Sequence, residues 1–263
     1  IVADDASTRN ECKQKNRLIN SLPHCTYIEL EKNIGRASIR NLLADKAQGE
    51  WLLFLDCDGM PLDDLFLKRY GQAIANHTEA DIICGGIIHP KELPASNMSL
   101  RYTYEKAAEK HHTATKRNER PYASFRTFNF MIRRNAFLQV KFDESFRHYG
   151  YEDVLFGIQL KESGFRIAHI DNPLENKDIE TNEIFLRKTE EALRTLAEHA
   201  DKLGESVHLH HLYLRLQRIG LLPIVRKLFQ WFAPTLQRNL LSNTPNLPYF
   251  AFYKLGYYAL LRK

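Results

Sequence analysis

The chain has 263 residues, of which 44% are hydrophobic and 26% charged, with 12 glycines and 10 prolines. This composition supports a substantial apolar core and excludes disordered, collagen-like and low-complexity proteins. Of the net charge of +5, residues 205–263 carry +7, from eight Lys and Arg against one acid, and residues 1–204 carry −2. A basic C-terminal segment favours an anionic surface such as a membrane as its partner, and we expect no nucleic acid partner.

Cysteine usage and hydropathy indicate the compartment. The four cysteines, at positions 12, 25, 57 and 84, contain no Cys-x-x-Cys pair, so we expect reduced thiols in a cytoplasmic protein. The longest apolar runs, such as residues 51–55, are far shorter than the roughly 20 residues that span a bilayer. The chain opens with Ile-Val-Ala-Asp-Asp, without an initiator Met or the features of a signal peptide, which favours an N-terminally incomplete sequence.

Hydrophobic periodicity predicts alternating strands and helices over the first 204 residues. The predicted strands cover residues 1–3, 26–30, 51–55, 81–88 with an interruption at Gly85 and Gly86, 125–133 and 165–170. The predicted helices cover residues 11–22, 37–48, 62–76, 100–112, 152–163 and 182–203. The run Trp-Leu-Leu-Phe-Leu at 51–55 does not alternate, which predicts a strand buried on both faces of a parallel sheet. The fold class is therefore α/β.

The composition changes after Gly204. Residues 205–263 hold 10 of the 29 aromatic residues, and their prolines are expected to break short basic and apolar helices at positions 223, 234, 245 and 248. We predict an α/β domain at 1–204 and a helical, basic-aromatic appendage at 205–263. Its Arg and Lys interleave with Leu, Trp and Phe, as in helices that lie on anionic membranes, although a helical lid or an oligomer contact has a similar pattern.

Asp56 and Asp58 directly follow the predicted strand at 51–55. Open α/β sheets bind ligands at the carboxyl ends of their strands, and hard divalent cations take oxygen ligands while leaving room for substrate phosphates. These carboxylates are therefore candidates for a metal-bound diphosphate site. The alternative is a solvated turn, because Asp-x-Asp spacing also arises by chance.

Two other acidic pairs stand at the ends of predicted elements. Asp4 and Asp5 end the first strand, where a carboxylate can accept hydrogen bonds from a nucleobase or a ribose. Glu152 and Asp153 open a helix, where the helix dipole favours carboxylates and an open neighbouring site would let one act as a base. For both pairs, ordinary turn formation and helix capping is the alternative interpretation.

Basic residues and histidines give weaker signals. Arg40 follows an Asn-Ile-Gly turn and would neutralise phosphate charge there, although a surface arginine on an amphipathic helix has the same spacing. His208, His210 and His211 lack a partner cluster, so we assign no zinc site. The chain contains no Gly-x-Ser-x-Gly, P-loop or Gly-x-Gly-x-x-Gly pattern, which leaves the acidic positions to carry any chemistry.

Four segments together resemble family 2 of the inverting glycosyltransferases. They are Ile-Val-Ala-Asp-Asp-Ala-Ser at 1–7, Asn-Ile-Gly with Arg-Asn at 33–41, Gly-Glu-Trp-Leu-Leu-Phe-Leu-Asp-Cys-Asp at 49–58 and Gly-Tyr-Glu-Asp at 150–153. The resemblance covers roughly residues 1–200. It implies a Rossmann-like A-type glycosyltransferase sheet with flanking helices, a nucleotide-sugar donor such as a UDP-sugar, and dependence on Mn²⁺ or Mg²⁺.

The resemblance also implies roles on the donor side. Asp4 or Asp5 would contact the nucleoside. Asp58, supported by Asp56, would serve the metal-bound diphosphate and the donor ribose or sugar.

On the acceptor side, the resemblance implies that Asp153 is the catalytic base and that Glu152 helps to orient the acceptor. The acceptor would be a hydroxyl of a glycan or a lipid-linked saccharide. The protein would then work in the cytoplasm, or peripherally on the inner face of the cytoplasmic membrane.

The chain departs from the family pattern in two places. A strand and helix that usually precede the Asp-Asp-x-Ser motif have no counterpart here, so we expect an N-terminally incomplete domain. A His that commonly serves as a further metal-side ligand is replaced by Asn176, whose carbonyl oxygen would be a weaker ligand.

Two rival functions remain. A non-catalytic glycosyltransferase-like domain would bind nucleotide or glycan without turnover. A metal-dependent nucleotidyltransferase would also use Asp56 and Asp58, but it usually needs a glycine-rich basic phosphate loop, which this sequence lacks.

Overall fold

The computed structural model describes residues 1–110 and 112–262. The strands are β1 (Val2–Asp4), β2 (Tyr27–Glu29), β3 (Trp51–Leu55), β4 (Gly59–Pro61), β5 (Ile82–Cys84), β6 (Ile87–Ile88), β7 (Asn129–Arg133), β8 (Ile167–His169) and β9 (Leu174–Asn176). The first helices are α1 (Asn10–Arg17), α2 (Arg36–Lys46), α3 (Phe66–Asn76), α4 (Ser99–Glu109), α5 (Ala114–Glu119) and α6 (Arg134–Val140). The later ones are α7 (Glu152–Glu162), α8 (Asn182–Glu198), α9 (Ala200–Leu203), α10 (His208–Arg218), α11 (Leu222–Leu240) and α12 (Leu247–Leu261).

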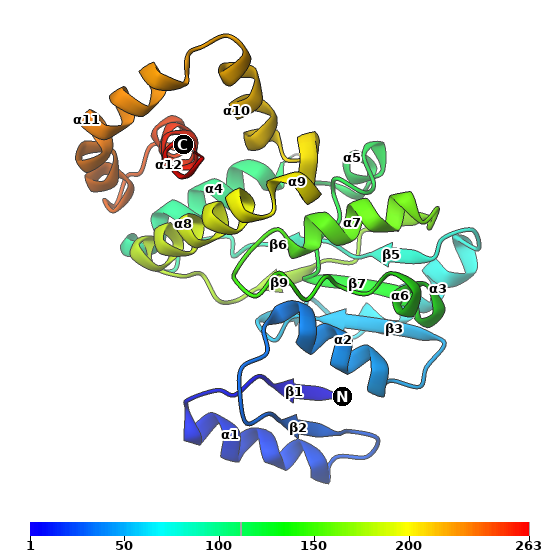
Figure 1. Ribbon diagram of the computed structural model, residues 1–263. Coiled ribbons are helices and arrows are strands. Elements are labelled where there is room, and N and C mark those ends of the chain that lie inside the picture. The colour runs from blue at the N-terminus through cyan, green and yellow to red at the C-terminus, as the bar shows by residue number, and fades with distance from the viewer. Residues whose placement is uncertain (111, 263) are drawn as a thin grey trace.

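The molecule has three parts along its length (Figure 1). The N-terminal strands β1 and β2 lie with α1 at one end, and a mixed sheet with helices on its faces forms the centre. The C-terminal helices α10, α11 and α12 lie at the opposite end, beside α8 and α4. The predicted α/β order of the body is therefore confirmed.

The central sheet has the strand order β3-β7-β5-β8. Strand β3 pairs with β7 in antiparallel register, so the expected parallel neighbours for β3 were wrong. The prediction that β3 is buried on both faces was only partly right. Leu52 and Phe54 are buried on one face, and Trp51 and Leu53 on the other are half-buried against a second apolar cluster. Leu55 is 45% exposed. The last residue is exposed because the strand ends there in the acidic turn that follows.

The predicted interruption at Gly85 and Gly86 divides one expected strand between two sheets. Strand β5 pairs with β7 and β8, whereas β6 pairs with β9. A Cβ on Gly85 would lie 2.4 Å from the carbonyl oxygen of Asn172 and 2.4 Å from Nδ2 of Asn129. Only glycine allows this approach of the chain segments.

A three-stranded sheet, β4-β9-β6, was not predicted. Its strands have only two or three residues each, too short for a periodic pattern to develop. Gly59 of β4 is in register with Asn176 of β9. This pairing places the segment after residue 173 beside the acidic turn at 56–58. The second half of the chain therefore contacts the C-terminal end of β3.

An apolar groove of about 220 Å³ lies between the first residue and β3. Ile1, Leu43, Ala44 and Ala47 line it together with residues of β3. Within the described residues, β1 pairs only with β2 and β3 only with β7. The edges of β1 and β3 that border the groove therefore have no strand partner in this part of the chain.

The C-terminal helices are longer than the prolines predict. Pro234 lies inside the 19-residue helix α11, so the expected break at this position was wrong. Pro234 is on the exposed side of the helix. Phe229 and Leu236 on the other side are buried in an apolar cluster with Phe250. This packing outweighs the backbone hydrogen bond that the proline cannot form. Pro223 and Pro248 occupy the first turns of α11 and α12, where no backbone N–H is needed.

Two apolar clusters cross the predicted boundary at Gly204. One contains Leu193 and Leu196 of α8 together with Tyr213 and Tyr258. The other joins Leu186 of α8 to residues of α11 and α12. The division at Gly204 stays a prediction, and the shared clusters show that the two parts pack on common apolar surface. Within residues 1–110 and 112–262, no helix combines the length and apolar character needed to cross a membrane.

Candidate active site

A cleft of about 780 Å³ opens at the C-terminal end of β3. Residues of β1, α2, α4, the N-terminus of α7 and the segment after β9 line it. Its acidic residues are Asp56, Asp58, Asp153, Asp178 and Glu180, and its basic residues are Arg36, Arg40, Arg101, Arg126 and Lys188. The cleft therefore brings the Asp-x-Asp turn and the Glu-Asp helix start, which are about 95 residues apart (153 − 58), to one place.

The Asp-x-Asp turn is held by backbone contacts. The N–H of Gly59 donates to the carbonyl of Asp56 at 3.1 Å, and the N–H of Lys177 donates to the carbonyl of Asp58 at 3.0 Å. A Cβ on Gly59 would lie 2.7 Å from Leu174, so the turn packs tightly against β9. These contacts leave the two carboxylates facing the cleft.

The Asp58 carboxylate lies among like charges. Burial raises the pKa of Asp58, and the negative charges of Asp56 and Asp178 raise it further, against the opposing effect of Arg101. Neither Asp58 nor Asp178 forms an ion pair with any residue in the described ranges. A cation between them would relieve this repulsion.

Arg40 connects the two acidic motifs. It is buried on α2, and its guanidinium donates to Oδ1 of Asp56 and to Oε1 of Glu152, both at 3.2 Å. The sequence places Arg40 beside a diphosphate; in the structure its charge is already shared by two carboxylates. Arg40 lines the cleft, so a donor phosphate would meet it from the open side.

Glu152 and Asp153 begin α7 and have different surroundings. Glu152 is 7% exposed; burial raises its pKa and the charge of Asp153 adds to this, against the opposing effect of Arg40. Asp153 lines the cleft, and within the described residues its side chain accepts a single hydrogen bond, from the N–H of Val154 at 2.8 Å. Asp153 is thus the accessible member of the pair and Glu152 the buried one.

Asp4 and Asp5 are engaged within the protein. Oδ1 of Asp4 accepts from the N–H of Ser7 at 2.6 Å and Oδ2 accepts from the hydroxyl of Tyr27 at 2.9 Å. Burial raises the pKa of Asp4, but these hydrogen bonds outweigh it and hold the pKa below its usual value.

Asp5 holds the turn before α2. Its carboxylate accepts from the N–H groups of Ile34 at 2.7 Å and Gly35 at 3.0 Å. Neither Asp4 nor Asp5 is among the residues that line the cleft, whereas residues 1–3 are. Contact of Asp4 or Asp5 with a nucleoside stays a prediction, and in the structure both carboxylates order the loops beside the cleft.

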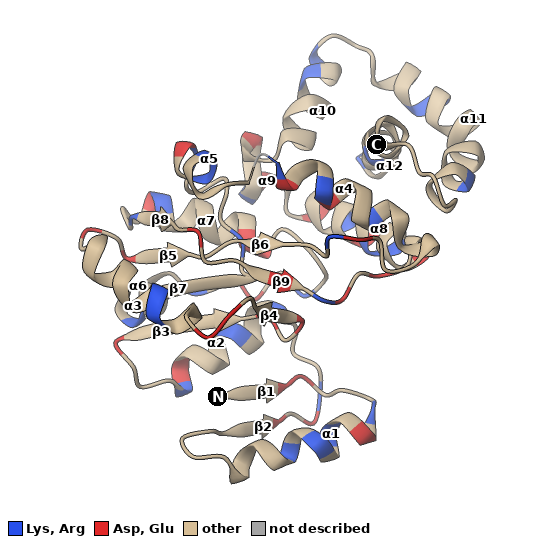
Figure 2. Ribbon diagram, turned by 180° about the vertical axis from the view of Figure 1, so that it is seen from behind, with Lys and Arg blue, Asp and Glu red and all other residues tan. Residues whose placement is uncertain are grey.

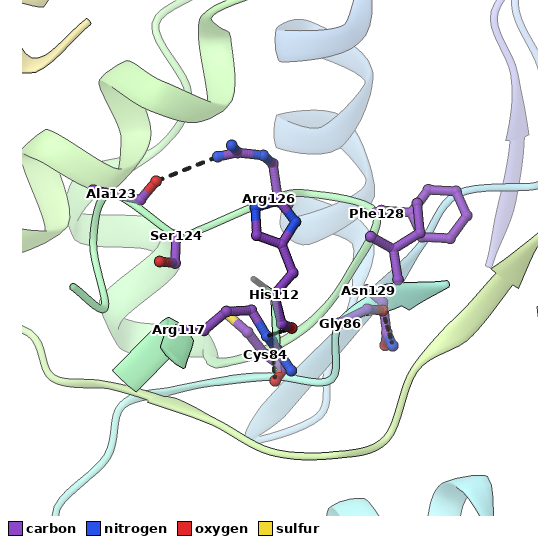
Figure 3. Close-up of a pocket in the computed structure, with 10 residues that line it drawn as sticks. Cys84, Gly86, His112, Arg117, Ala123, Ser124, Arg126, Phe128 and Asn129 are labelled. Atoms are coloured by element: carbon purple, nitrogen blue, oxygen red, sulfur yellow. Dashed lines mark hydrogen bonds between the residues drawn. The ribbon is translucent and has the colours of Figure 1, made fainter. Parts of the chain in front are cut away.

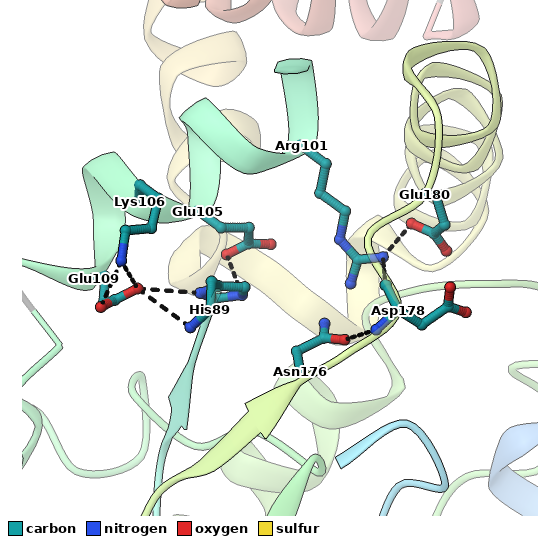
Figure 4. Close-up of polar contacts among 8 residues, drawn as sticks. All are labelled: His89, Arg101, Glu105, Lys106, Glu109, Asn176, Asp178 and Glu180. Atoms are coloured by element: carbon teal, nitrogen blue, oxygen red, sulfur yellow. Dashed lines mark hydrogen bonds and ion pairs between the residues drawn. The ribbon is translucent and has the colours of Figure 1, made fainter. Parts of the chain in front are cut away.

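Asn176 presents its amide nitrogen where a metal ligand was expected (Figure 4). The side chain is 1% exposed, and its Oδ1 accepts from the N–H of Asp178 at 3.0 Å. Its Nδ2 is buried without a hydrogen-bond partner, and so is Nε of Arg101. Figure 4 shows the Arg101 guanidinium near Asn176, beside Asp178 and Glu180, so two buried N–H donors without an acceptor lie in one region of the cleft.

Sequence reasoning missed several residues that line the cleft. Arg101 of α4 donates to the carbonyl of Asp178 at 3.3 Å and pairs with Glu180. Arg36 lies 4.5 Å and Lys188 5.5 Å from the ring centre of Tyr149. Asp178 repeats the Asp-x-Asp spacing after Asn176, a signal that was available; the basic residues lie in segments without a motif.

A second cavity of about 80 Å³ adjoins the cleft (Figure 3). Its buried Arg117 donates to the carbonyls of Cys84, Gly85 and Ile170 and to Nδ1 of His169. Burial lowers the pKa of Arg117. This arginine fastens the segments around the Gly85 break and has no carboxylate within hydrogen-bond distance in the described chain.

The C-terminal histidines make protein contacts. Nδ1 of His210 lies 2.7 Å from the Tyr258 hydroxyl, and Nδ1 of His211 lies 2.8 Å from Glu205. Across the described residues, no group of three or more His, Cys, Asp or Glu is arranged to hold a metal. A cation at the Asp-x-Asp turn would therefore depend on one or two carboxylates, completed by phosphate and water oxygens, as is usual for Mg²⁺.

Known proteins resemble this chain in sequence and in fold. A protein named as an uncharacterized glycosyltransferase in Haemophilus influenzae is 31% identical over 77 residues, which is 29% of this chain and 31% of that protein. The mannosyltransferase PcManGT from Pyrobaculum calidifontis, solved in complex with GDP-Man and Mn²⁺, is similar with a TM-score of 0.57 at 15% identity, over 99% of this chain and 75% of that chain. TarS from S. aureus has a TM-score of 0.47 at 20% identity, over 75% of this chain and 33% of that chain.

The match spans about a third of the length of the Haemophilus relative and of TarS. The likeness to the mannosyltransferase concerns the fold, and it confirms the expected A-type glycosyltransferase architecture. The sequence profile of glycosyl transferase family 2 matches residues 1–140. This stretch is more than half of the 263 residues, and the chain therefore belongs to glycosyl transferase family 2.

Proposed function

We propose that this protein transfers a sugar from a nucleoside diphosphate donor to a hydroxyl of a glycan or a lipid-linked saccharide, with inversion and with the help of Mn²⁺ or Mg²⁺. One observation carries the proposal: a single cleft holds Asp56 and Asp58 at the end of β3 and Asp153 at the start of α7. Transfer needs one acidic group that is neutralised and another that is free to accept a proton. The two motifs meet this need from two sides of the cleft.

The residues at the Asp-x-Asp turn fit a hard divalent cation. Asp58 lies within the influence of Asp56 and Asp178, and a cation there would take oxygens from one or two of these carboxylates. Mg²⁺ and Mn²⁺ prefer oxygen ligands and bind nucleotide phosphates together with one or two carboxylates. A cation held there would neutralise the charge that develops on the leaving diphosphate.

We infer that Asn176 and Arg101 bind an oxygen of the donor diphosphate. Both side chains line the cleft, and each has a buried N–H group without a partner. Buried donors without an acceptor are costly, and a phosphate oxygen between them would satisfy both. In this assignment Asn176 acts beside the metal through its nitrogen, and its oxygen remains bonded to Asp178.

The transfer step places Asp153 at the acceptor. The acceptor oxygen attacks the anomeric carbon while the bond from that carbon to the diphosphate oxygen breaks, and Asp153 takes the hydroxyl proton. A single displacement of this kind inverts the anomeric centre. Glu152 is held by Arg40, so we assign it the positioning of α7 and of the acceptor.

The experiment is a nucleotide-release assay with a panel of UDP- and GDP-sugars and oligosaccharide acceptors, in Mn²⁺ and in EDTA. Asp153→Asn is expected to lower turnover by about 10²-fold or more while binding of the nucleotide persists. Asp64→Asn, at an exposed position on the far turn before α3, is the matched control and should retain activity.

Three outcomes would contradict the proposal. Full activity of Asp153→Asn would remove this residue as the base. Nucleotide binding without turnover of any donor would favour a non-catalytic binding domain. Pyrophosphate release from nucleoside triphosphates would favour a nucleotidyltransferase.

A further inference from the structure

An exposed apolar stripe runs along α11 and the turn that joins it to α10. On α11 its members are Ile224, Leu228, Trp231 and Phe232. Their intervals of four, three and one residues place them on one face of the helix. The opposite face, with Phe229, Leu236 and Leu240, is buried. The exposed side chains are Ile219, Leu221, Ile224, Leu228, Trp231 and Phe232.

The stripe is large for a surface feature. Trp231 is 66% exposed, Ile219 65% and Phe232 51%. Tryptophan and phenylalanine exposed side by side on a surface helix mark an interaction site, and tryptophan is typical of the region where lipid headgroups meet acyl chains.

The surroundings of the stripe carry positive charge only. Residues 206–262 contain no Asp or Glu, and Figure 2 shows Lys and Arg without acidic residues on α10, α11 and α12. Arg215, Lys227 and Arg238 are exposed and form no ion pair within the described residues. The ammonium group of Lys227 lies 5.0 Å from the ring centre of Trp231, so charge and apolar surface adjoin.

Arg226 does not belong to this surface. Its guanidinium donates to the carbonyls of Ala259 at 2.8 Å and Arg262 at 2.9 Å, which satisfies the C-terminal end of α12. One arginine of the segment is thus structural, while its neighbour Lys227 is free to face a ligand.

We propose that the exposed face of α11 and of the turn before it binds an anionic lipid surface, with α11 lying in the plane of the interface. Trp231, Phe232 and Ile224 would enter the boundary between headgroups and acyl chains, and Lys227 and Arg238 would meet lipid phosphates. Electrostatic attraction of these basic residues to the anionic membrane adds to the apolar burial. None of the described helices is able to cross the bilayer, so contact is peripheral.

A second copy of the chain fits this face poorly. A symmetric contact would place the same patch against itself. Lys227 and Arg238 of both copies would then meet without an acidic residue to compensate them, because none occurs in 206–262. The charge of the surface therefore favours lipid phosphates as the occupant.

The test is co-sedimentation with vesicles of phosphatidylcholine alone and of an equimolar mixture of phosphatidylcholine and phosphatidylglycerol. We expect binding to the mixed vesicles, weak binding to the neutral vesicles, and release at high salt. Vesicle binding is measured without substrate, so it stands or fails separately from the transfer reaction.

Two double variants separate the apolar and the electrostatic contributions. Trp231→Ser with Phe232→Ser and Lys227→Glu with Arg238→Glu should each lower the partition coefficient by about tenfold or more. Leu67→Ser, which alters a side chain 67% exposed on α3, is the control and should bind like the unaltered protein. Thermal melting of every variant shows that it is folded.

Equal binding to neutral and mixed vesicles, or binding unchanged in both double variants, would overturn the proposal. A lack of binding to the mixed vesicles would also overturn it. Dimers in analytical ultracentrifugation that the Trp231→Ser, Phe232→Ser variant abolishes would then identify a second copy as the occupant.

Discussion

Arg40 lies between Asp56 and Glu152. Its Nη2 is 3.2 Å from Oδ1 of Asp56, and its Nη1 is 3.2 Å from Oε1 of Glu152. The Arg40 and Glu152 side chains are 9% and 6% exposed, so water contributes little to their solvation. Asp56 follows Arg40 by 16 residues in the chain, and Glu152 follows it by 112 residues. One buried cation thus joins the end of β3 to the start of α7.

Removal of this cation should destabilise the fold. Arg40→Ala leaves Glu152 buried without a counter-charge, and the expected loss is about 3 kcal/mol in the free energy of unfolding. Adding Glu152→Gln to Arg40→Ala should recover about 1 kcal/mol or more, because a neutral amide costs less to bury than a carboxylate. Urea denaturation of the single and double variants measures both effects, and a double variant no more stable than Arg40→Ala would contradict the pairing.

Nucleotide affinity should depend on Asp58 and on metal. We expect UDP or GDP binding by isothermal titration calorimetry in Mn²⁺, and much weaker but measurable binding in EDTA or in Asp58→Ala. Asp64→Ala, at an exposed surface position, serves as the control. Metal-independent binding of the same strength in Asp58→Ala would exclude the turn at 56–58 as the metal site.

Asn176 should contribute through its N–H group. Asn176→Asp removes that donor and adds a negative charge near Asp58 and Asp178, so UDP affinity measured without metal should fall about tenfold or more. UMP affinity should change much less, because UMP lacks the second phosphate. Equal losses for UMP and UDP would show that Asn176 does not face the diphosphate.

Acid should destabilise the protein through His169. Burial, together with the charge of Arg117, lowers the pKa of His169 to about 4, against 6.5 for the free side chain. Between these values the unfolded chain binds more protons than the folded chain, so stability falls as the pH drops from 6.5 to about 4. The loss attributable to this residue is about 3 kcal/mol at full effect.

Unfolding free energies across this pH range provide the measurement. His169→Gln should flatten the dependence, whereas His77→Gln, at an exposed position, should leave it unchanged. An unaltered slope in His169→Gln would assign the acid sensitivity to other groups.

Two glycines make a matched pair for the packing around β5. Gly85→Ala places a Cβ 2.4 Å from the carbonyl of Asn172 and 2.7 Å from the Tyr70 hydroxyl, and should lower stability by about 3 kcal/mol. Gly71→Ala, inside α3 with no atom within 4 Å of the new Cβ, should raise it by about 0.5–1 kcal/mol. Thermal unfolding of both variants measures these changes in stability. Similar changes for Gly85→Ala and Gly71→Ala would contradict the close approach at Gly85.

The sequence by itself determined the local elements and the positions of the acidic motifs. An apolar run ended by Asp56 and Asp58 predicts a buried strand and an exposed acidic end, because burial and charge separate along a few consecutive residues. The glycine pair at 85–86 likewise marks a break, because its cause is the backbone itself. These features depend on neighbours in the chain, and a single sequence contains them.

Only the tertiary structure decided which groups are free. Asp4 and Asp5 resemble ligand-binding carboxylates in sequence, yet contacts 3 to 30 residues away occupy their oxygens. The antiparallel pairing of β3 with β7, the burial of the Asn176 amide and the partners of Arg40 all depend on segments far apart in the chain. Their side chains were visible in the sequence, but their hydrogen-bond partners were not, because packing of the apolar core brings those partners together.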